Sequence, residues 1–185
     1  MQSYSTQNDL LLNTLMDFYK KGDHLDKMLS IINGTTKISL RIIDWFSTNY
    51  AKKNFTVYDY NGRRFKVYID YKLKLKAYSK RRFDPFCRWE RISIPYKEDC
   101  EVQTTIGQLN FFKWAIENGV IDYVSEKYDD IEADMNSRNS TSKKKSLIAS
   151  GVIENKKTRK KREELSVSAS KSIKKENVEI VVSFD

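Results

Sequence analysis

Nearly all the aromatic residues of this chain precede residue 129, and this limits where a hydrophobic core can form. The three tryptophans are Trp45, Trp89 and Trp114, and Phe184 is the single aromatic residue after position 128. Aromatic side chains contribute much of the apolar area that a small core buries. The distribution therefore predicts a compact domain over residues 1–136 and a separate tail over residues 137–185.

The tail is rich in Ser, Lys, Asn and Thr. Such a segment cannot bury enough apolar area to offset the ordering of its backbone, which costs about 1 to 2 kcal/mol per residue. We therefore expect the tail to be disordered in the free protein. The exception is VEIVVSF at residues 178–184, a β-prone string that could add a strand to a sheet of the same chain or of a partner.

Most of the domain shows apolar residues at helical spacing. Five helices are expected. The first is capped by Asn8 or Asp9, the second covers residues 25–32, and the third is capped by Thr35 or Thr36. The fourth follows the capping-box pair Thr105 and Gln108 and ends at Asn118, and the fifth covers residues 120–135. The chain is thus predicted to be mainly helical.

The apolar period changes to two after Asn54. Asn61-Gly62 separates two alternating, β-prone runs at residues 55–60 and 63–69, which is a strong signal for a β-hairpin. Residues 71–82 fit either period, and we favour a basic helix that Asp84-Pro85 stops. With a short strand at residues 91–94, the prediction is an α+β fold: a small, mainly helical domain with one β-hairpin and a short extra strand, then a disordered basic tail.

Charge is distributed unevenly along the chain. Residues 52–91 contain 13 Lys/Arg and 4 Asp/Glu, residues 92–137 contain 3 and 10, and residues 138–185 contain 13 and 6. Blocks of excess Lys/Arg neutralise phosphates and release their counterions, so nucleic acid is the first partner to consider. The alternative is that these blocks are solvated faces and a solubilising tail.

In the basic middle of the chain, cations alternate with aromatic residues. Cations can hold phosphates while exposed rings stack on bases, which predicts a nucleic-acid surface, whereas aromatics that lie in the core would leave the cations as a charged rim. The expected phosphate-binding residues are Arg63, Arg64, Lys66, Lys72, Lys76, Lys80, Arg81, Arg82 and Arg88.

The tail contains two basic clusters ten residues apart, the spacing of a bipartite nuclear-import signal. The same charges could tether the protein to DNA, and Lys-rich tails often match this pattern by accident. The clusters consist of Lys143, Lys144 and Lys145, then Lys156, Lys157, Arg159, Lys160, Lys161 and Arg162. An importin is therefore a candidate partner of the tail.

The sequence offers little for catalysis. It contains no phosphate-binding glycine loop and no nucleophile-elbow motif, and His24 is the single histidine. Together with Cys87 and Cys100, His24 gives three N/S ligands where a tetrahedral zinc site needs four. We therefore expect a protein that is not an enzyme and binds no metal or cofactor.

Two further features are a group of acidic side chains and the length of the apolar runs. Acidic residues at helical spacing could bind a divalent ion, although a solvated face is the usual explanation; they are Asp129, Asp130, Glu132 and Asp134. No apolar run approaches the roughly 20 residues of a transmembrane helix. We therefore expect a soluble, intracellular protein with no membrane partner.

Several strings of this sequence resemble a set of small proteins of nucleocytoplasmic large DNA viruses, the giant viruses. These strings are ISLRIIDWFSTNYAKKN, LKAYSKRRFDPFCRWERI, TIGQLNFFKWAIENGVIDY and TRKKREELSVSASKSIKKENVEIVVSFD. The resemblance covers the chain from about residue 25 to its end and brings no catalytic residue with it. It implies a eukaryotic host and a location in the nucleus, the viral factory or the virion.

Two functions follow from these observations. The first is a non-enzymatic nucleic-acid-binding protein, with DNA favoured, whose basic hairpin, helix and tail bind phosphate. The alternative is a virion structural or adaptor protein whose tail docks on a neighbouring viral structural protein.

Overall fold

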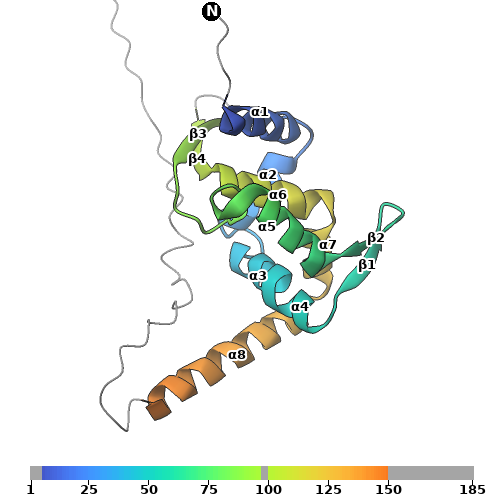
Figure 1. Ribbon diagram of the computed structural model, residues 1–185, viewed down its shortest axis with the longest axis vertical. Helices are drawn as coiled ribbons and strands as arrows, with labels where there is room; N and C mark the ends of the chain where they lie inside the picture. Colours follow the sequence, from blue (N-terminus) through green and yellow to red (C-terminus); the bar gives the residue numbers. More distant parts are fainter. Residues whose placement is uncertain (1–5, 97–99, 150–185) are drawn as a thin grey trace, which may run out of the picture.

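The computed structural model describes residues 6–96 and 100–149 and shows a mainly helical domain with two small β-hairpins (Figure 1). This confirms the predicted α+β class. The first half contains α1 (Gln7–Tyr19), α2 (His24–Ile32), α3 (Leu40–Trp45), a π-helical turn η1 (Phe46–Tyr50), α4 (Ala51–Lys53), β1 (Val57–Tyr60) and β2 (Arg63–Lys66). The second half contains α5 (Val67–Phe83), β3 (Arg91–Tyr96), β4 (Cys100–Thr105), α6 (Ile106–Glu117), α7 (Val120–Glu126) and α8 (Tyr128–Ala149).

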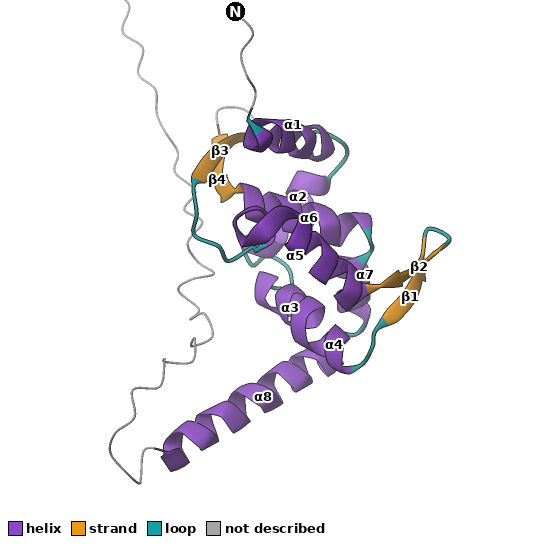
Figure 2. Ribbon diagram, in the orientation of Figure 1, coloured by secondary structure: helices purple, strands orange, loops and turns teal. Residues whose placement is uncertain are grey.

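The core is built around α6, which other helices surround (Figure 2). Leu109, Phe111 and Phe112 on this helix are fully buried. Helix α5 packs beside α6, and Tyr71 and Phe83 of α5 form ring contacts with Phe111. At the other side, the buried Tyr19 hydroxyl donates a 2.7 Å hydrogen bond to the Leu109 carbonyl oxygen, which fixes α1 to the same helix.

The predicted hairpin is confirmed, and its turn has the expected backbone. β1 and β2 pair antiparallel, with Tyr58 opposite Phe65. Asn61 and Gly62 have φ values of 49° and 71°, as a type I′ turn requires. The second arm ends at Lys66 instead of residue 69, because Val67 is fully buried and begins the inward face of α5.

The second hairpin was only half predicted. β3 extends to Tyr96 and pairs antiparallel with β4, a strand that was not predicted. β4 ends directly at Thr105, whose hydroxyl oxygen accepts the Gln108 amide at 3.2 Å and so caps α6. The Gln108 side chain does not complete the capping box, because its Oε1 accepts the Thr104 hydroxyl instead.

Two helix starts differ from prediction. Thr6, not Asn8 or Asp9, caps α1, and Asp9 supplies the reciprocal carboxylate of a capping box. Ser39 caps α3 in place of Thr35 or Thr36, because its hydroxyl accepts the Ile42 amide. Both errors arise because several capping residues stand close together before each helix, so that composition alone does not select one.

The acidic helix predicted up to about residue 135 consists of α7 and α8, and α8 continues to Ala149. The segment 137–149, which composition predicts as disordered, is therefore helical. Arg138 supports this continuation, since its guanidinium lies 3.5 Å from Asp134 and over the Trp45 ring. Residues 150–185, including 178–184, lie outside the described part of the chain. Among the described helices, none combines the length and apolar character needed to cross a bilayer.

Candidate nucleic-acid interface

The first hairpin packs one face against the core, and this fixes the direction of the other. On the inner face, the Tyr58 hydroxyl donates a 2.8 Å hydrogen bond to the Asn118 carbonyl oxygen, and its ring stacks on Tyr123. Tyr60 lies so close to Gly119 that any side chain there would overlap its ring. Arg64 and Lys66 alternate with the inward-facing Phe65 and are exposed.

Helix α5 likewise has an inner and an outer side. Val67 and Tyr71 are buried, and the Asp70 carboxylate accepts a 2.6 Å hydrogen bond from the Trp114 indole of α6. Lys72 and Lys76 are exposed. One of the four acidic residues of the basic segment is thereby bonded to a core side chain.

Helix α5 is interrupted one turn before its end. Ser79 leaves helical geometry with φ 65° and ψ 168°, a region that is almost restricted to glycine. Three cations follow this kink. The Arg81 guanidinium lies 5.1 Å from the centre of the Trp89 ring, and Arg82 donates a hydrogen bond to Gln7.

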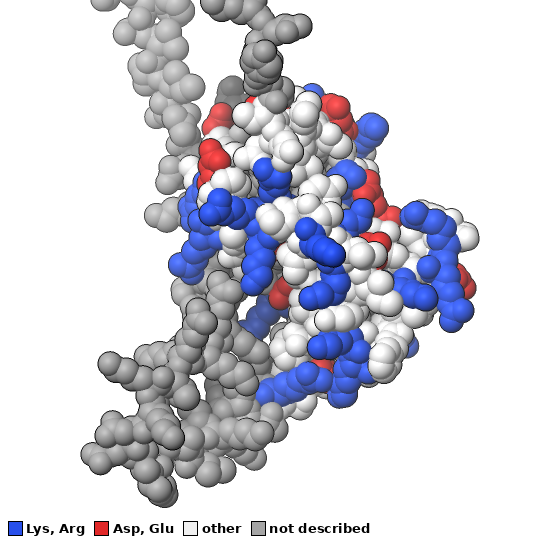
Figure 3. Space-filling model, in the orientation of Figure 1, with Lys and Arg blue, Asp and Glu red and all other residues white. Residues whose placement is uncertain are grey.

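Within the described part of the chain, the predicted cations are not engaged in ion pairs, although Arg64 stands opposite Asp59 across the hairpin. Among the side chains that the structure describes, in residues 6–96 and 100–138, none of the nine predicted phosphate-binding residues forms an ion pair. Other cations of the same part do, among them Lys20, Lys27, Lys37, Lys53, Lys113 and Arg138. Figure 3 shows Lys and Arg gathered over the hairpin, α5 and the neighbouring surface. We call the nine residues the basic surface.

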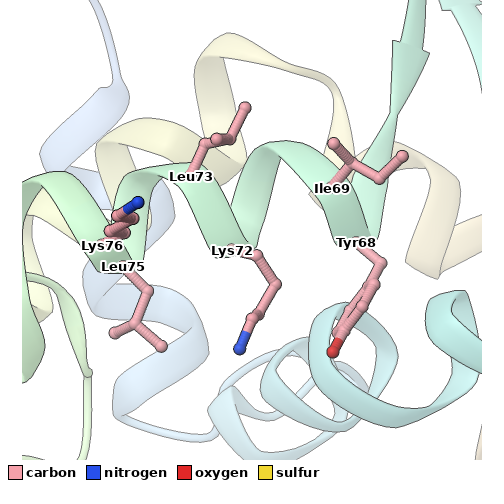
Figure 4. Close-up of a pocket in the computed structure, with 6 residues that line it drawn as sticks. All are labelled: Tyr68, Ile69, Lys72, Leu73, Leu75 and Lys76. Carbon is pink, nitrogen blue, oxygen red and sulfur yellow. The ribbon is translucent and has the colours of Figure 1, made fainter.

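A hollow of about 540 Å³ runs along α5 within this surface. It is lined by Tyr68, Ile69, Lys72, Leu73, Leu75 and Lys76. In Figure 4, Tyr68, Lys72 and Leu75 point to one side of α5, whereas Ile69 and Leu73 point to the other. Lys52 of α4 joins this region, since its Nζ lies 5.7 Å from the Tyr68 ring centre. Lys52 was not among the predicted site residues, because it precedes the hairpin along the chain.

The aromatic residues predicted to stack on bases divide into two groups. Tyr71 and Phe83 are buried and belong to the core. For these two residues, the alternative that the aromatic rings are core side chains and not base-stacking groups is therefore correct. The others are half-buried: Tyr58, Tyr60, Tyr68, Tyr78, Phe86 and Trp89. The most exposed aromatic residue of the described part is Phe55, at 86%, which the sequence analysis did not select.

Two of the four acidic residues proposed for a divalent ion, Asp129 and Asp134, are paired with cations. Asp129 pairs with Lys37 at 2.9 Å. Burial opposes ionisation of Asp134, but hydrogen bonds from Lys53 and Trp45 lower its pKa overall. Over the described residues, no three His, Cys, Asp or Glu side chains are grouped for a metal ion.

The remaining candidates have structural surroundings. His24 stacks on Phe18 and lies 3.0 Å from the Phe18 carbonyl oxygen, at the junction of α1 and α2. Cys87 and Cys100 are free thiols, and both are half-buried. Of the two tail clusters, Lys143–Lys145 lie in α8, whereas residues 156–162 lie outside the described part.

Comparison with known proteins identifies relatives but no solved structure. The model of a family of unknown function, DUF7197, matches residues 2–185. "Uncharacterized protein L507" of Acanthamoeba polyphaga mimivirus is 46% identical over 127 residues, which are 64% of this chain and 49% of that protein. The chain thus matches about half the length of this relative. That virus is a nucleocytoplasmic large DNA virus, so the expected resemblance is confirmed. No solved structure matches.

Proposed function

We propose that this chain, which belongs to the family DUF7197, binds nucleic acid without catalysing a reaction on it. Its basic surface would bind phosphates, and DNA is the favoured ligand because the mimivirus relative comes from a virus with a large DNA genome. Phosphate contacts position a protein on nucleic acid and supply most of its sequence-independent affinity.

The observation that carries this proposal is the lack of ion pairs within the basic surface. Exposed cations elsewhere in the described chain, such as Lys20, Lys27 and Lys37, have carboxylates nearby. A solubilising surface gains nothing from leaving its cations without ion pairs, because mixed charges serve solubility equally well. A phosphate-binding surface does gain, since each unpaired cation can replace a counterion of the nucleic acid.

The test compares two variants of the full chain with the same loss of charge. The first changes Arg63, Arg64, Lys72, Lys76 and Lys80 to Gln. The control changes five exposed lysines outside the basic segment: Lys20, Lys21, Lys27, Lys37 and Lys127. If each changed residue of the first variant contacts a phosphate, the slope of log K against log salt falls by roughly 3.5 to 4.5.

The control variant should keep most of the wild-type slope, and both variants should keep the wild-type melting temperature, because exposed charges contribute little to stability. Fluorescence anisotropy of labelled DNA over a range of salt concentrations measures both slopes. Equal slopes for the two variants would show that net charge alone causes binding, and would reject the basic surface.

The tail clusters form a separate part of the proposal, in which they direct the protein to the nucleus. Neutralising either Lys143–Lys145 or Arg159–Arg162 should abolish nuclear accumulation of a reporter fused to residues 137–185. Unchanged accumulation of both variants would reject the nuclear-import signal, and the viral factory or the virion would then be the expected location.

A second candidate function is that of a virion structural or adaptor protein. The observation that favours it is the exposure of Ile69 and Leu73, at 55% and 60%, one helical turn apart beside the hollow. Changing both to Ser should then remove a tagged protein from purified virus particles, while the variant with five Gln residues is retained. Retention of the Ser variant would reject docking through these two residues.

A further inference from the structure

Phe55 lies where a protein chain usually places glycine. Helix α4 ends at Lys53, and the Thr56 amide donates a 3.1 Å hydrogen bond back to the Ala51 carbonyl oxygen. Phe55, with φ 48°, occupies the left-handed position that this backbone bond encloses. This is the arrangement of a Schellman motif, in which the left-handed residue is most often glycine because a Cβ atom is disfavoured there.

No packing compensates for this strained position. The Phe55 side chain is 86% exposed, the highest value among the large hydrophobic residues of the described part. A single exposed apolar residue needs no explanation by itself. An exposed aromatic ring on a strained backbone does, because such strain persists mainly where function requires it.

The surroundings of Phe55 indicate what the ring could bind. The Val67 amide donates a 3.3 Å hydrogen bond to the Thr56 carbonyl oxygen, so Phe55 lies where the hairpin meets the start of α5. Lys66 is paired with Val57 across the hairpin, and Lys52 lies one turn earlier at the end of α4. Both lysines are exposed, and neither forms an ion pair within the described part.

An exposed ring with exposed lysines on both adjoining elements, Lys52 in α4 and Lys66 in β2, suits a strand whose phosphates and bases are both accessible. We propose that Phe55 stacks on a base of single-stranded nucleic acid while Lys52 and Lys66 contact the adjacent phosphates. This inference rests on the proposed function and adds its substrate class. In a duplex the bases already stack on each other, so a ring can engage them only after a step has been opened.

The key variant is Phe55→Gly, because it removes the ring and suits the backbone. The full-length variant should be at least as stable as the wild type, since glycine adopts this φ without strain. Its affinity for an oligothymidine strand should fall by roughly 5- to 150-fold, the usual effect of losing one stacked base. Its salt slope should stay unchanged, because no phosphate contact has been removed.

Three comparisons make the test specific. Phe55→Trp should retain the affinity, since it preserves a stacking ring. Leu10→Ala, which removes an exposed apolar side chain of α1 that belongs neither to the basic surface nor to the hollow, should bind as the wild type does. Binding of Phe55→Gly to a duplex of the same length should equal that of the wild type.

The outcomes separate this inference from the proposed function. If the wild type binds oligothymidine with a salt slope and Phe55→Gly binds equally well, stacking is rejected and the basic surface stands. An equal loss on single strands and duplex also rejects it, because base stacking would act on the single strand. If the wild type binds neither ligand, both proposals fail.

Discussion

The Trp114 indole Nε1 donates a hydrogen bond of 2.6 Å to the Asp70 carboxylate, and this contact joins core helix α6 to the helix that carries much of the basic surface. Because the bond lies on the inner side of α5, it also holds the orientation in which Lys72 and Lys76 are exposed. The stability of the core and the presentation of the cations therefore depend on the same pair of residues.

Removing the acceptor of this bond should destabilise the domain. In Asp70→Ala the indole N–H of the buried Trp114 loses its partner, which should lower the free energy of unfolding by about 1 to 3 kcal/mol. Asp59→Ala is the matched control, since Asp59 is exposed and such changes usually stay within about 0.5 kcal/mol. Urea unfolding measures both values. Equal stability of the two variants would contradict a structural role for the bond.

The sequence predicted the elements whose signals are local. The hairpin followed from Asn61-Gly62, where the turn itself requires positive φ at both positions, and the end of α5 followed from Asp84-Pro85. The nine cations of the basic surface were also identified from sequence, because an excess of Lys/Arg over Asp/Glu is visible in composition. Their function remains a proposal.

What the sequence could not provide depends on contacts between distant residues. β4 escaped prediction because the pairing of Arg91 with Thr105 and its neighbours defines it, and its own residues carry weak strand signals. The burial of Tyr71 depends on α6, so an alternating pattern of rings and cations could not separate core from surface. Phe55 was missed because nothing in the residue type reveals that its backbone is left-handed.

Backbone strain at Ser79 should lower the free energy of unfolding of the domain. The backbone there, at φ 65° and ψ 168°, is readily adopted only by glycine. Ser79→Gly should therefore raise the free energy of unfolding by about 1 kcal/mol or more. Ser79→Ala is the control, since Ala keeps the Cβ atom and should bring no such gain. If both variants had the wild-type stability, the kink would not be strained.

Close packing of the hairpin on the core can be tested at Gly119. A Cβ atom there would overlap the Tyr60 ring, so Gly119→Ala should destabilise the domain in two ways. Alanine disfavours the positive φ of this position, and the overlap with the ring should cost about 1 to 3 kcal/mol more. Gly34→Ala isolates the first cost, because Gly34 has φ 72° and no atom within 4 Å of such a Cβ.

A double variant identifies the origin of the overlap. Adding Tyr60→Ala to Gly119→Ala should recover stability relative to the two single effects taken together, because the overlapping ring is gone. Additive effects of the two changes would place the strain elsewhere.

The pH dependence of stability should contain a contribution from Asp44. This residue is half-buried, and burial of its carboxyl group, with the nearby Asp84 charge, raises its pKa to about 7. An unfolded Asp has a pKa of about 3.9, so the folded state holds the proton more tightly. The stabilising contribution of the protonated carboxyl is complete below about pH 4 and is lost as the pH rises through about 7.

The measurement compares the wild type with Asp44→Asn by urea unfolding from pH 4.5 to pH 8. The free energy of unfolding of the wild type alone does not isolate Asp44 when it is plotted against pH. Asp9 and Asp134 have lowered pKa values, so their contributions to stability increase with pH, whereas that of Asp44 decreases. The difference between the two proteins removes those contributions. Relative to the Asn variant, the wild type should lose stability steadily as the pH rises toward about 7 and level off above it, because an ionised Asp44 must then be accommodated beside Asp84. A difference that does not vary over this range would mean that Asp44 is well solvated in the folded protein.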